Sequence, residues 1–336
     1  MTDNDAPPIG LDEVAARSQA VLESVQSVVV GKDEALKLVL AGILAGGHIL
    51  LEDLPGLGKT LTARCFAQSL GLDFRRLQFT PDLLPADVTG SFLYNQKTAE
   101  FVYRKGPVHT NLLLADEINR TPPKTQSALL EAMQERQVSV EGETYPLPRP
   151  FTVLATSNPV EFEGTYQLPE AQLDRFLLRV SFGYPNQDEE WEVLKRRLGR
   201  GREEVELAPV IEAETLVRMQ EALEQVVVED SVGRYMVAIA AASRGHAQLQ
   251  VGASPRGSLA LLLASRALAV LNGRDFVTPD DVKGVAPAAL AHRITLRPEL
   301  WMRRIDPVQI VADICQAVEA PQTAQAPAYS QTPPGR

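Results

Sequence analysis

The fold of this chain is decided by the stretch Leu51-Glu52-Asp53-Leu54-Pro55-Gly56-Leu57-Gly58-Lys59-Thr60. An apolar run precedes it and a helical pattern follows it, so the stretch predicts a glycine-rich loop between a strand and a helix. In such loops, backbone N–H groups surround phosphate oxygens, a lysine meets the terminal phosphates, and a threonine hydroxyl binds Mg²⁺. We therefore expect a nucleotide site in which Lys59, with a solvent-facing side chain, meets the phosphates and Thr60 meets the metal.

The loop departs from the usual pattern at its first position, because Asp53 stands where the leading glycine of GxxxxGK[ST] is expected. The alternative to a nucleotide site is a simple glycine turn that connects a strand to a helix. The order of strand, loop and helix favours the nucleotide site. The residues expected to contact the nucleotide are Pro55, Gly56, Leu57, Gly58, Lys59, Thr60 and Leu61.

A second motif lies downstream, where the apolar run 112–115 ends in Asp116 and Glu117. Such a run predicts a buried strand that carries two carboxylates at its tip. Asp116 is then expected to hold Mg²⁺ near the nucleotide, and Glu117 to polarise the attacking water. Together and in this order, the two motifs predict that the chain binds ATP.

Apolar strand candidates recur along the first half of the chain, with helical segments between them. They cover residues 48–51, 75–79, 111–115 and 151–156. This alternation predicts an α/β domain with a parallel sheet and helices on both faces. Two further stretches, 90–106 and 138–145, each predict an inserted β-hairpin. The sequence leaves open whether the hairpins are packed decoration or exposed elements that grip a substrate.

After Pro185 the strand signals fade and helical patterns take over. Ser254-Pro255 and Thr278-Pro279 each predict a helix start, with a hydroxyl residue as N-cap and a proline at the first helical position. A tail rich in proline, glutamine, threonine and alanine predicts disorder. The expected parts are a flexible N-terminus (1–10), an α/β nucleotide-binding domain (11–184), an all-α domain (185–318) and a disordered tail (319–336).

The composition argues against several classes of protein. The net charge is −10, which disfavours a dominant nucleic-acid surface. A basic cluster at 195–202 is flanked by acidic residues and is interpreted as a solvated helix face. The two cysteines, the acidic N-terminus and the lack of a long apolar run predict a cytoplasmic protein without membrane insertion, and nucleic acid is not an expected partner.

Three further polar residues are candidates for the same chemistry. Asn158 follows an apolar strand at the edge where open α/β sheets bind ligands, so it is either a residue that orients water or an ordinary Asn-Pro turn. Arg175 either stabilises charge on the γ-phosphate or pairs with Asp174 or Glu170. Arg256 lies at a helix N-terminus, where the dipole disfavours a cation. Either an anion such as the ATP phosphates offsets this unfavourable interaction, or exposure of Arg256 to water makes it weak.

Four blocks of sequence closely resemble the MoxR family of AAA+ ATPases, in the family's order. They are QFTPDLLP (78–85), LADEINRTPPKTQSALLEAMQE (114–135), EGTYQLPEAQLDRF (163–176) and GASPR (252–256), within a match over roughly residues 20–316. The resemblance implies a parallel-sheet AAA+ P-loop core with inserted hairpins, followed by a small all-α lid. It also implies that Asn158 is sensor 1, Arg175 an arginine finger for a neighbouring subunit, and Arg256 sensor 2. Val30 and Gly31 match the segment that lines the adenine pocket.

The same resemblance implies an ATPase that remodels, matures or activates partner proteins, working as a ring and most simply as a hexamer. The expected clients are proteins with von Willebrand factor A domains. One alternative is the ATPase subunit of a metal-chelatase-like complex, which shares the two hairpin insertions. Another is a slow ATP-binding switch whose assembled state is its output. A nucleic-acid motor is disfavoured by the acidic balance and by hairpin tips that are nearly neutral or acidic.

Overall fold

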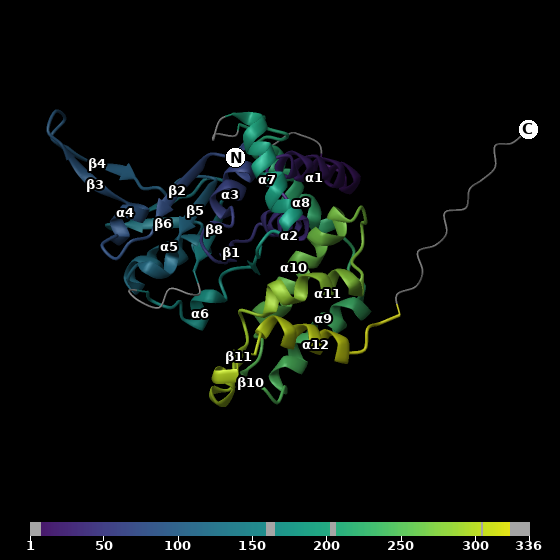
Figure 1. Ribbon diagram of the computed structural model, residues 1–336. Coiled ribbons are helices and arrows are strands. Elements are labelled where there is room, and N and C mark those ends of the chain that lie inside the picture. Colours follow the sequence, from purple (N-terminus) through teal and green to yellow (C-terminus); the bar gives the residue numbers. More distant parts are fainter. Residues whose placement is uncertain (1–7, 159–164, 202–205, 304, 323–336) are drawn as a thin grey trace, which may run out of the picture.

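The computed structural model describes residues 8–158, 165–201, 206–303 and 305–322 (Figure 1). Most of the expected flexible N-terminus (1–10) and disordered tail (319–336) therefore lies outside the described residues, as do Asn158's neighbour Pro159 and part of the 163–176 block. None of the helices in these described ranges combines the length and hydropathy that crossing a bilayer requires.

A parallel sheet of five strands forms the centre of the first half of the chain, in the order β2-β5-β8-β1-β9. Its strands are β1 (Ile49–Glu52), β2 (Phe74–Gln78), β5 (Leu112–Asp116), β8 (Thr152–Ser157) and β9 (Leu178–Val180). The four strands expected from the sequence are confirmed. The sequence did not predict β9, because three residues are too few to show a strand pattern.

Helices cover both faces of the sheet, because side chains along each strand alternate between two separate groups of buried residues. Ile49 and Leu51 belong to one group and Leu50 to the other. The first group is shared with α1 (Leu11–Gln26), α2 (Asp33–Leu44) and α3 (Lys59–Ser69), and the second with α4 (Pro85–Thr89) and α5 (Pro123–Glu135). The predicted α/β layering is therefore confirmed.

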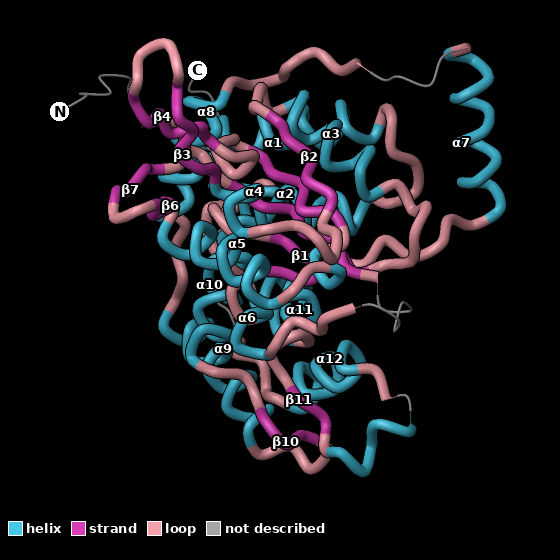
Figure 2. The backbone as a smooth tube through the Cα atoms, turned by 90° about the vertical axis from the view of Figure 1, so that its left-hand side faces the viewer, coloured by secondary structure: helices cyan, strands magenta, loops and turns pink. Residues whose placement is uncertain are grey.

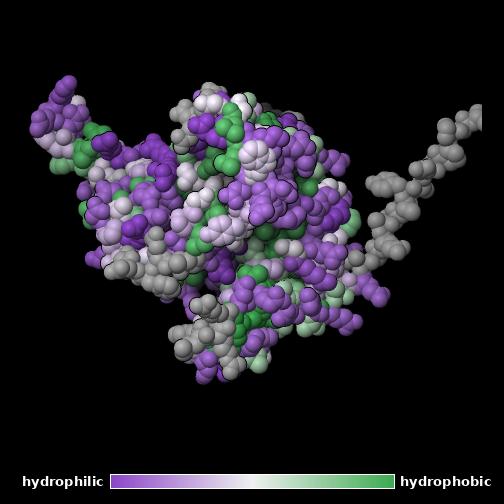
Figure 3. Space-filling view, in the orientation of Figure 1, coloured by the Kyte–Doolittle hydropathy of each residue, from purple (hydrophilic) through white to green (hydrophobic). Residues whose placement is uncertain are grey.

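Both predicted hairpins form as antiparallel pairs. They are β3 (Gly90–Asn95) with β4 (Glu100–Lys105), and β6 (Gln137–Val140) with β7 (Glu143–Pro146). The first projects from the body, and Figure 3 shows a hydrophilic tip beyond apolar side chains. Tyr94 and Phe101 are exposed there, whereas the Tyr103 and Tyr145 rings stack at 4.1 Å between centroids and join the two hairpins.

The second half is helical, and it adds a short antiparallel ribbon, β10 (Leu249–Val251) with β11 (Thr295–Leu296), that the all-α prediction did not include. Strands of two and three residues carry no period-2 pattern to detect. The remaining elements are η1 (Ile118–Arg120), α6 (Glu170–Leu173), α7 (Gln187–Arg200), α8 (Ala213–Ala222), η2 (Leu223–Gln225), α9 (Asp230–Arg244), β10 (Leu249–Val251), α10 (Pro255–Leu271), α11 (Pro279–Leu290), β11 (Thr295–Leu296), η3 (Pro298–Arg303) and α12 (Pro307–Ala317).

The N-caps of two lid helices are confirmed. The Ser254 hydroxyl accepts a hydrogen bond from the Arg256 N–H at the start of α10, and Thr278 and Asp281 form a capping box at the start of α11. Buried residues of α10 and α11 belong to the same hydrophobic group as α1 and α2. The lid is thus packed on the helices that cover one face of the sheet, whereas α7 stands apart from the body in Figure 2.

Candidate functional site

The glycine-rich loop joins the C-terminal end of β1 to the N-terminus of α3, as predicted. Gly56 and Gly58 have φ of 83° and 82°, a left-handed conformation that strains any residue with a side chain. Gly58 is the N-cap of α3, so the first N–H groups of this helix are directed at the loop. These donors and the positive end of the helix dipole make the loop a site for an anion.

Lys59 folds back onto the loop, so the expectation of a solvent-facing side chain is wrong. Its Nζ donates a hydrogen bond to the backbone oxygen of Asp53 at 2.6 Å, and the side chain is partly buried. Burial lowers the pKa of Lys59, against the opposing effect of the nearby carboxylates of Asp53, Asp116 and Glu117. The ammonium group therefore lies between the phosphate loop and the acidic pair at the tip of β5.

Asp116 ends β5, and both oxygens of its buried carboxylate are engaged. Oδ1 accepts a hydrogen bond from the Thr156 hydroxyl at 2.6 Å, and Oδ2 accepts one from Arg76 Nη2 at 2.6 Å. Thr156 comes from β8 and Arg76 from β2, the two strands that flank β5 in the sheet. Neither contact is predicted by the sequence, because strand order cannot be read from the chain. The available signal was the pair of polar residues Arg76 and Gln78, whose side chains lie on the same face of β2 near its end.

Glu117 follows Asp116 in a left-handed conformation, with φ 57° and ψ 51°. Its backbone N–H donates to the Thr156 hydroxyl at 2.8 Å, which fixes the turn. Its carboxylate accepts hydrogen bonds from Gln78 Nε2 at 2.7 Å and Arg120 Nη1 at 3.1 Å. The carboxylate expected to activate water is thus held by two neighbours in this structure.

Asn158 directly follows β8, which lies between β5 and β1 in the sheet. The residue is buried, and its backbone oxygen accepts a hydrogen bond from Asn119 Nδ2 at 3.4 Å. The C-terminal ends of β1, β8 and β5 share one edge, since all three strands are parallel. That edge therefore brings together the phosphate loop, Asn158 and the acidic pair.

A cavity of about 300 Å³ opens beside the phosphate loop. It is lined by Val28, Val29, Val30, Lys32, Gly56, Leu57, Gly58, Leu61, Pro185, Glu190, Val193, Leu194, Arg196 and Arg200. Val30 and Leu61, two of the residues expected to contact the nucleotide, line this cavity. Gly31 lies between two lining residues with φ 68°, and a Cβ there would come within 2.2 Å of the Glu189 side chain on α7. The mostly apolar wall and its size suit a nucleotide base.

The sequence does not predict the contribution of α7 to this cavity, since the basic cluster at 195–202 is typical of a solvated helix face. For Arg196 that interpretation is wrong. Its Nη1 donates hydrogen bonds to the backbone oxygens of Gln26 and Ser27, both at 2.8 Å, at the C-terminal end of α1. Arg202, the last residue of the cluster, lies outside the described residues.

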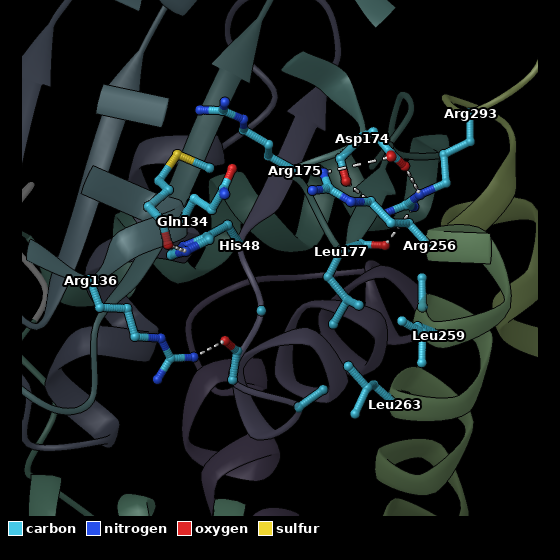
Figure 4. Close-up of a pocket in the computed structure, with 15 residues that line it drawn as sticks. His48, Gln134, Arg136, Asp174, Arg175, Leu177, Arg256, Leu259, Leu263 and Arg293 are labelled. Atoms are coloured by element: carbon cyan, nitrogen blue, oxygen red, sulfur yellow. Dashed lines mark hydrogen bonds and ion pairs between the residues drawn. The ribbon is translucent and has the colours of Figure 1, made fainter. Parts of the chain in front are cut away.

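A second cavity, of about 340 Å³, lies at the other end of β1, next to His48 (Figure 4). Four arginines line it, namely Arg136, Arg175, Arg256 and Arg293. His48 directly precedes β1 and the phosphate loop follows it, so the four residues of β1, about 13 Å of extended chain, separate the two cavities. The structure does not bring Arg175 and Arg256 to the phosphate loop of their own chain.

Asp174 organises the arginines in this second cavity. Its Oδ1 accepts a hydrogen bond from Arg293 Nε at 2.8 Å, and its Oδ2 lies 3.8 Å from Arg256 Nη1. Arg256 therefore has a carboxylate beside its helix N-terminus. Glu170, the other partner considered for Arg175, accepts a hydrogen bond from the Thr295 hydroxyl instead.

The guanidinium of Arg175 has no hydrogen bond or ion pair with any residue in the described ranges, and Figure 4 shows it directed away from Asp174. Among the described residues, Arg175 therefore does not form the local ion pair with Asp174 or Glu170 that the sequence left open. A half-buried arginine at the rim of a cavity remains able to meet an anion that comes from outside this chain.

Oxygen ligands for a metal ion are present only in part. Within the described ranges, no group of three or more histidine, cysteine, aspartate or glutamate residues is placed to hold a metal ion. Mg²⁺ is commonly bound through one or two protein oxygens together with substrate phosphates and water. The hydroxyl of Thr60 and the carboxylate of Asp116 fit that donor set, which would be completed by a nucleotide.

Comparison with known proteins agrees with this arrangement. Residues 48–178 match the ATPase family associated with various cellular activities (AAA), and residues 241–314 match the AAA lid domain. The chain is 42% identical to the chaperone MoxR1 of Mycobacterium tuberculosis, in a match that covers 98% of this chain and 90% of that protein. The chain belongs to the MoxR family of AAA+ ATPases.

Two further relatives span most of this MoxR-family chain. It is 52% identical to the uncharacterized protein YeaC of Bacillus subtilis over 89% of this chain and 93% of that protein. A crystal structure from Cytophaga hutchinsonii superposes with a TM-score of 0.85, at 41% identity, and the match covers 92% of this chain and 96% of the other. The predicted AAA+ core with a helical lid is confirmed, and the protein is a nucleotide-binding ATPase.

Proposed function

We propose that this MoxR-family ATPase binds ATP with Mg²⁺ at the C-terminal edge of its sheet and hydrolyses it in a ring, in order to remodel partner proteins. The observation that carries the proposal is the division of the site between two ends of β1. One end holds the phosphate loop, Asn158 and the acidic pair, and the other holds Arg175, whose guanidinium is unengaged within the described residues.

Within one subunit, the roles follow from position. Lys59 would leave the Asp53 backbone oxygen to meet the β- and γ-phosphates, and the N–H groups of the loop would surround their oxygens. Thr60 and Asp116 would hold Mg²⁺, which supplies charge stabilisation and orients the phosphates. Glu117 would accept a proton from the attacking water and Asn158 would orient that water. Val30, Gly31 and Leu61 would form part of the adenine pocket with α7.

The contacts of the acidic pair support a resting state. Arg76 occupies one oxygen of Asp116, and Gln78 and Arg120 hold Glu117. The Gln78 and Arg120 hydrogen bonds both reach Glu117 Oε2, so these partners must be displaced before that oxygen can accept a proton from water. We infer that Asp116 and Glu117 exchange these partners for metal and water when ATP binds, so that hydrolysis waits for a properly filled site.

Between subunits, Arg175 and Arg256 would reach the nucleotide of a neighbour. An arginine placed on the γ-phosphate stabilises the charge that develops as the phosphoryl group transfers. Because Arg175 and Arg256 line one cavity at the end of β1 remote from their own loop, a ring would let that cavity face the next subunit's site. We expect the ring to be hexameric.

Protein clients are favoured over nucleic acid. One relative is named a chaperone, and the net charge of −10 disfavours a polyanion. The exposed Tyr94 and Phe101 of the β3–β4 hairpin offer an apolar surface suited to a protein chain. We expect clients with von Willebrand factor A domains. The match along nearly the whole chain to a MoxR protein weighs against a metal-chelatase subunit.

A slow ATP-binding switch is the second candidate function, and the engaged state of Glu117 is the observation in its favour. The two candidates differ in turnover. An ATPase that remodels clients should accelerate when a client is added, whereas a switch should hold ATP and release its partner only after slow hydrolysis.

The test of the ring proposal is a mixing experiment. Arg175→Ala and Glu117→Gln should each be nearly inactive alone, whereas mixed rings should recover turnover. The recovery occurs at interfaces where an Arg175→Ala subunit, with its intact Glu117, receives the arginine of a Glu117→Gln neighbour. Subunit exchange is verified by fluorescence transfer between labelled subunits. If exchange occurs and no mixing ratio restores hydrolysis, Arg175 does not act between subunits.

A further inference from the structure

Asp53 is a buried carboxylate at the start of the phosphate loop, where the usual pattern has a glycine. Asp53 is not one of the described residues with positive φ, so the backbone does not require glycine there. A negative charge beside a phosphate site weakens anion binding by like-charge repulsion. The carboxylate therefore serves some purpose other than phosphate binding.

The carboxylate of Asp53 holds the chain segment that follows β9. Oδ1 accepts hydrogen bonds from the Ser181 hydroxyl at 2.6 Å and the Gly183 N–H at 3.2 Å, and Oδ2 accepts one from the Phe182 N–H at 2.5 Å. Hydrogen bonds to an ionised carboxylate are among the stronger ones in proteins. On the other side of this segment, Lys32 Nζ donates to the Gly183 oxygen at 3.0 Å.

The held segment leads directly into α7, the helix that forms one wall of the base pocket. None of the residues of α7 is buried, and the helix stands apart from the body in Figure 2. Its position therefore depends on a few anchors rather than on a hydrophobic core. Two of these anchors are Arg196 on the end of α1 and the 181–183 segment bound to Asp53.

We propose that Asp53 is a positioning residue that couples the phosphate loop to α7 and so keeps the base pocket closed around the adenine ring. The inference rests on the proposed binding of ATP at this site. The proposal assigns recognition of the two parts of ATP to different residues. Recognition of the base depends on the Asp53 carboxylate, whereas recognition of the triphosphate depends on Lys59 and the loop.

The experiment compares ATP with inorganic tripolyphosphate, both with Mg²⁺, by calorimetry on the full chain. In Asp53→Gly, which restores the usual loop pattern, ATP affinity should fall about 10- to 100-fold, the scale of lost charge-assisted hydrogen bonds. Tripolyphosphate affinity should stay the same or rise, because a negative charge is removed. Asp53→Asn removes the charge but keeps an acceptor, so its loss of ATP affinity should be smaller.

Tryptophan fluorescence reports on the position of α7 itself. Trp191 lies on α7 and is 59% exposed, and Trp301→Phe leaves it as the single tryptophan. In that background ATP should shift the Trp191 emission, and Asp53→Gly should abolish the shift. Ser181→Ala removes one donor to Asp53 and is the milder variant if Asp53→Gly does not fold. Ser181→Ala should lower the affinity for ATP by about threefold to tenfold and leave the affinity for tripolyphosphate unchanged.

Four results would overturn the proposal. Equal weakening of ATP and tripolyphosphate in Asp53→Gly would make Asp53 a support of the loop only. An unchanged Trp191 response in Asp53→Gly, or an unchanged ATP affinity in Ser181→Ala, would show that α7 does not depend on the contact. If the wild-type chain bound tripolyphosphate as tightly as ATP, the cavity would not be a base pocket, and the proposed adenine site would fail together with this inference.

Discussion

The two ends of β1 differ in how they are built. The phosphate loop follows the strand within a few residues, and the acidic pair ends a neighbouring strand, so this end is made of short continuous motifs. The end that carries Arg175 is assembled from parts far apart in the sequence, since Arg256 and Arg293 reach Asp174 from the lid. Under the proposed function, the first end binds the nucleotide of its own subunit, whereas Arg175 at the second end meets the nucleotide of a neighbouring subunit.

The largest effect is expected at the second end. Arg175→Ala should lower the hydrolysis rate by about 10³-fold or more, because an arginine finger acts on the charge of the transition state. Affinity for ATP in isolated subunits should change little, since the residue lies away from its own phosphate loop. Phosphate release and calorimetry measure the two quantities. Arg234→Ala, on the exposed face of α9, is a matched control that should match wild type.

An affinity loss in Arg175→Ala as large as its rate loss would break the comparison, because it would place this arginine at the nucleotide of its own subunit. The measurement is therefore made on the dissociated chain as well as on the assembled form.

Glu117→Gln should lower hydrolysis by about 10²- to 10⁴-fold, the usual contribution of a general base. ATP and Mg²⁺ binding should persist, because Asp116 and Lys59 are untouched, and the variant should accumulate with ATP bound. Single-turnover phosphate release gives the rate. Glu131→Gln, exposed on α5, is the control and should turn over normally. Turnover of Glu117→Gln at the wild-type rate would move the base elsewhere.

Lys59→Ala should weaken ATP binding by about 100-fold, the effect of removing a charged partner of the terminal phosphates. Because Lys59 is only partly buried and its one hydrogen bond goes to a backbone oxygen, the melting temperature without nucleotide should shift by a few degrees at most. Calorimetry and a thermal melt test the two statements. Retained affinity would remove the phosphate-loop assignment and leave only the arginine end as an anion site.

A smaller effect concerns His48, which lies beside the arginine cavity and is fully buried. Burial lowers the pKa of His48 from 6.5 to about 4, and its ring nitrogens engage the Met133 oxygen and the Val153 N–H. The neutral form is favoured on folding, so its contribution to stability is complete above pH 6.5 and is lost as pH falls toward 4. Between pH 6.5 and 5 this amounts to about 2 kcal/mol.

Urea unfolding across that pH range measures the effect, and His48→Gln should show a shallower slope. The slope should not vanish, because burial also lowers the pKa of His292 and adds to the same window. An identical slope in wild type and variant would mean that His48 is not protonated on unfolding in this range.

Features built from short continuous segments could be predicted from the sequence, whereas contacts between distant segments could not. The four longer strands, the two hairpins and the caps at Ser254 and Thr278 all follow from patterns within about ten residues. The strand β9 and the ribbon β10–β11 could not be predicted, since three residues or fewer leave no periodicity. The contacts of Arg76 and Gln78 could not be predicted for another reason, because their partners Asp116 and Glu117 lie 40 and 39 residues away at the end of β5.

The sequence by itself determined that this chain has a phosphate loop, an acidic strand tip and a helical second half, because each is fixed by local backbone and side-chain preferences. Only the tertiary structure decided that Arg175 and Arg256 lie away from their own loop, that Asp53 holds the segment before α7, and that Glu117 is held by Gln78 and Arg120. Those relations depend on which strands become neighbours and where the lid packs. Non-local hydrophobic burial settles both, and residue spacing does not record it.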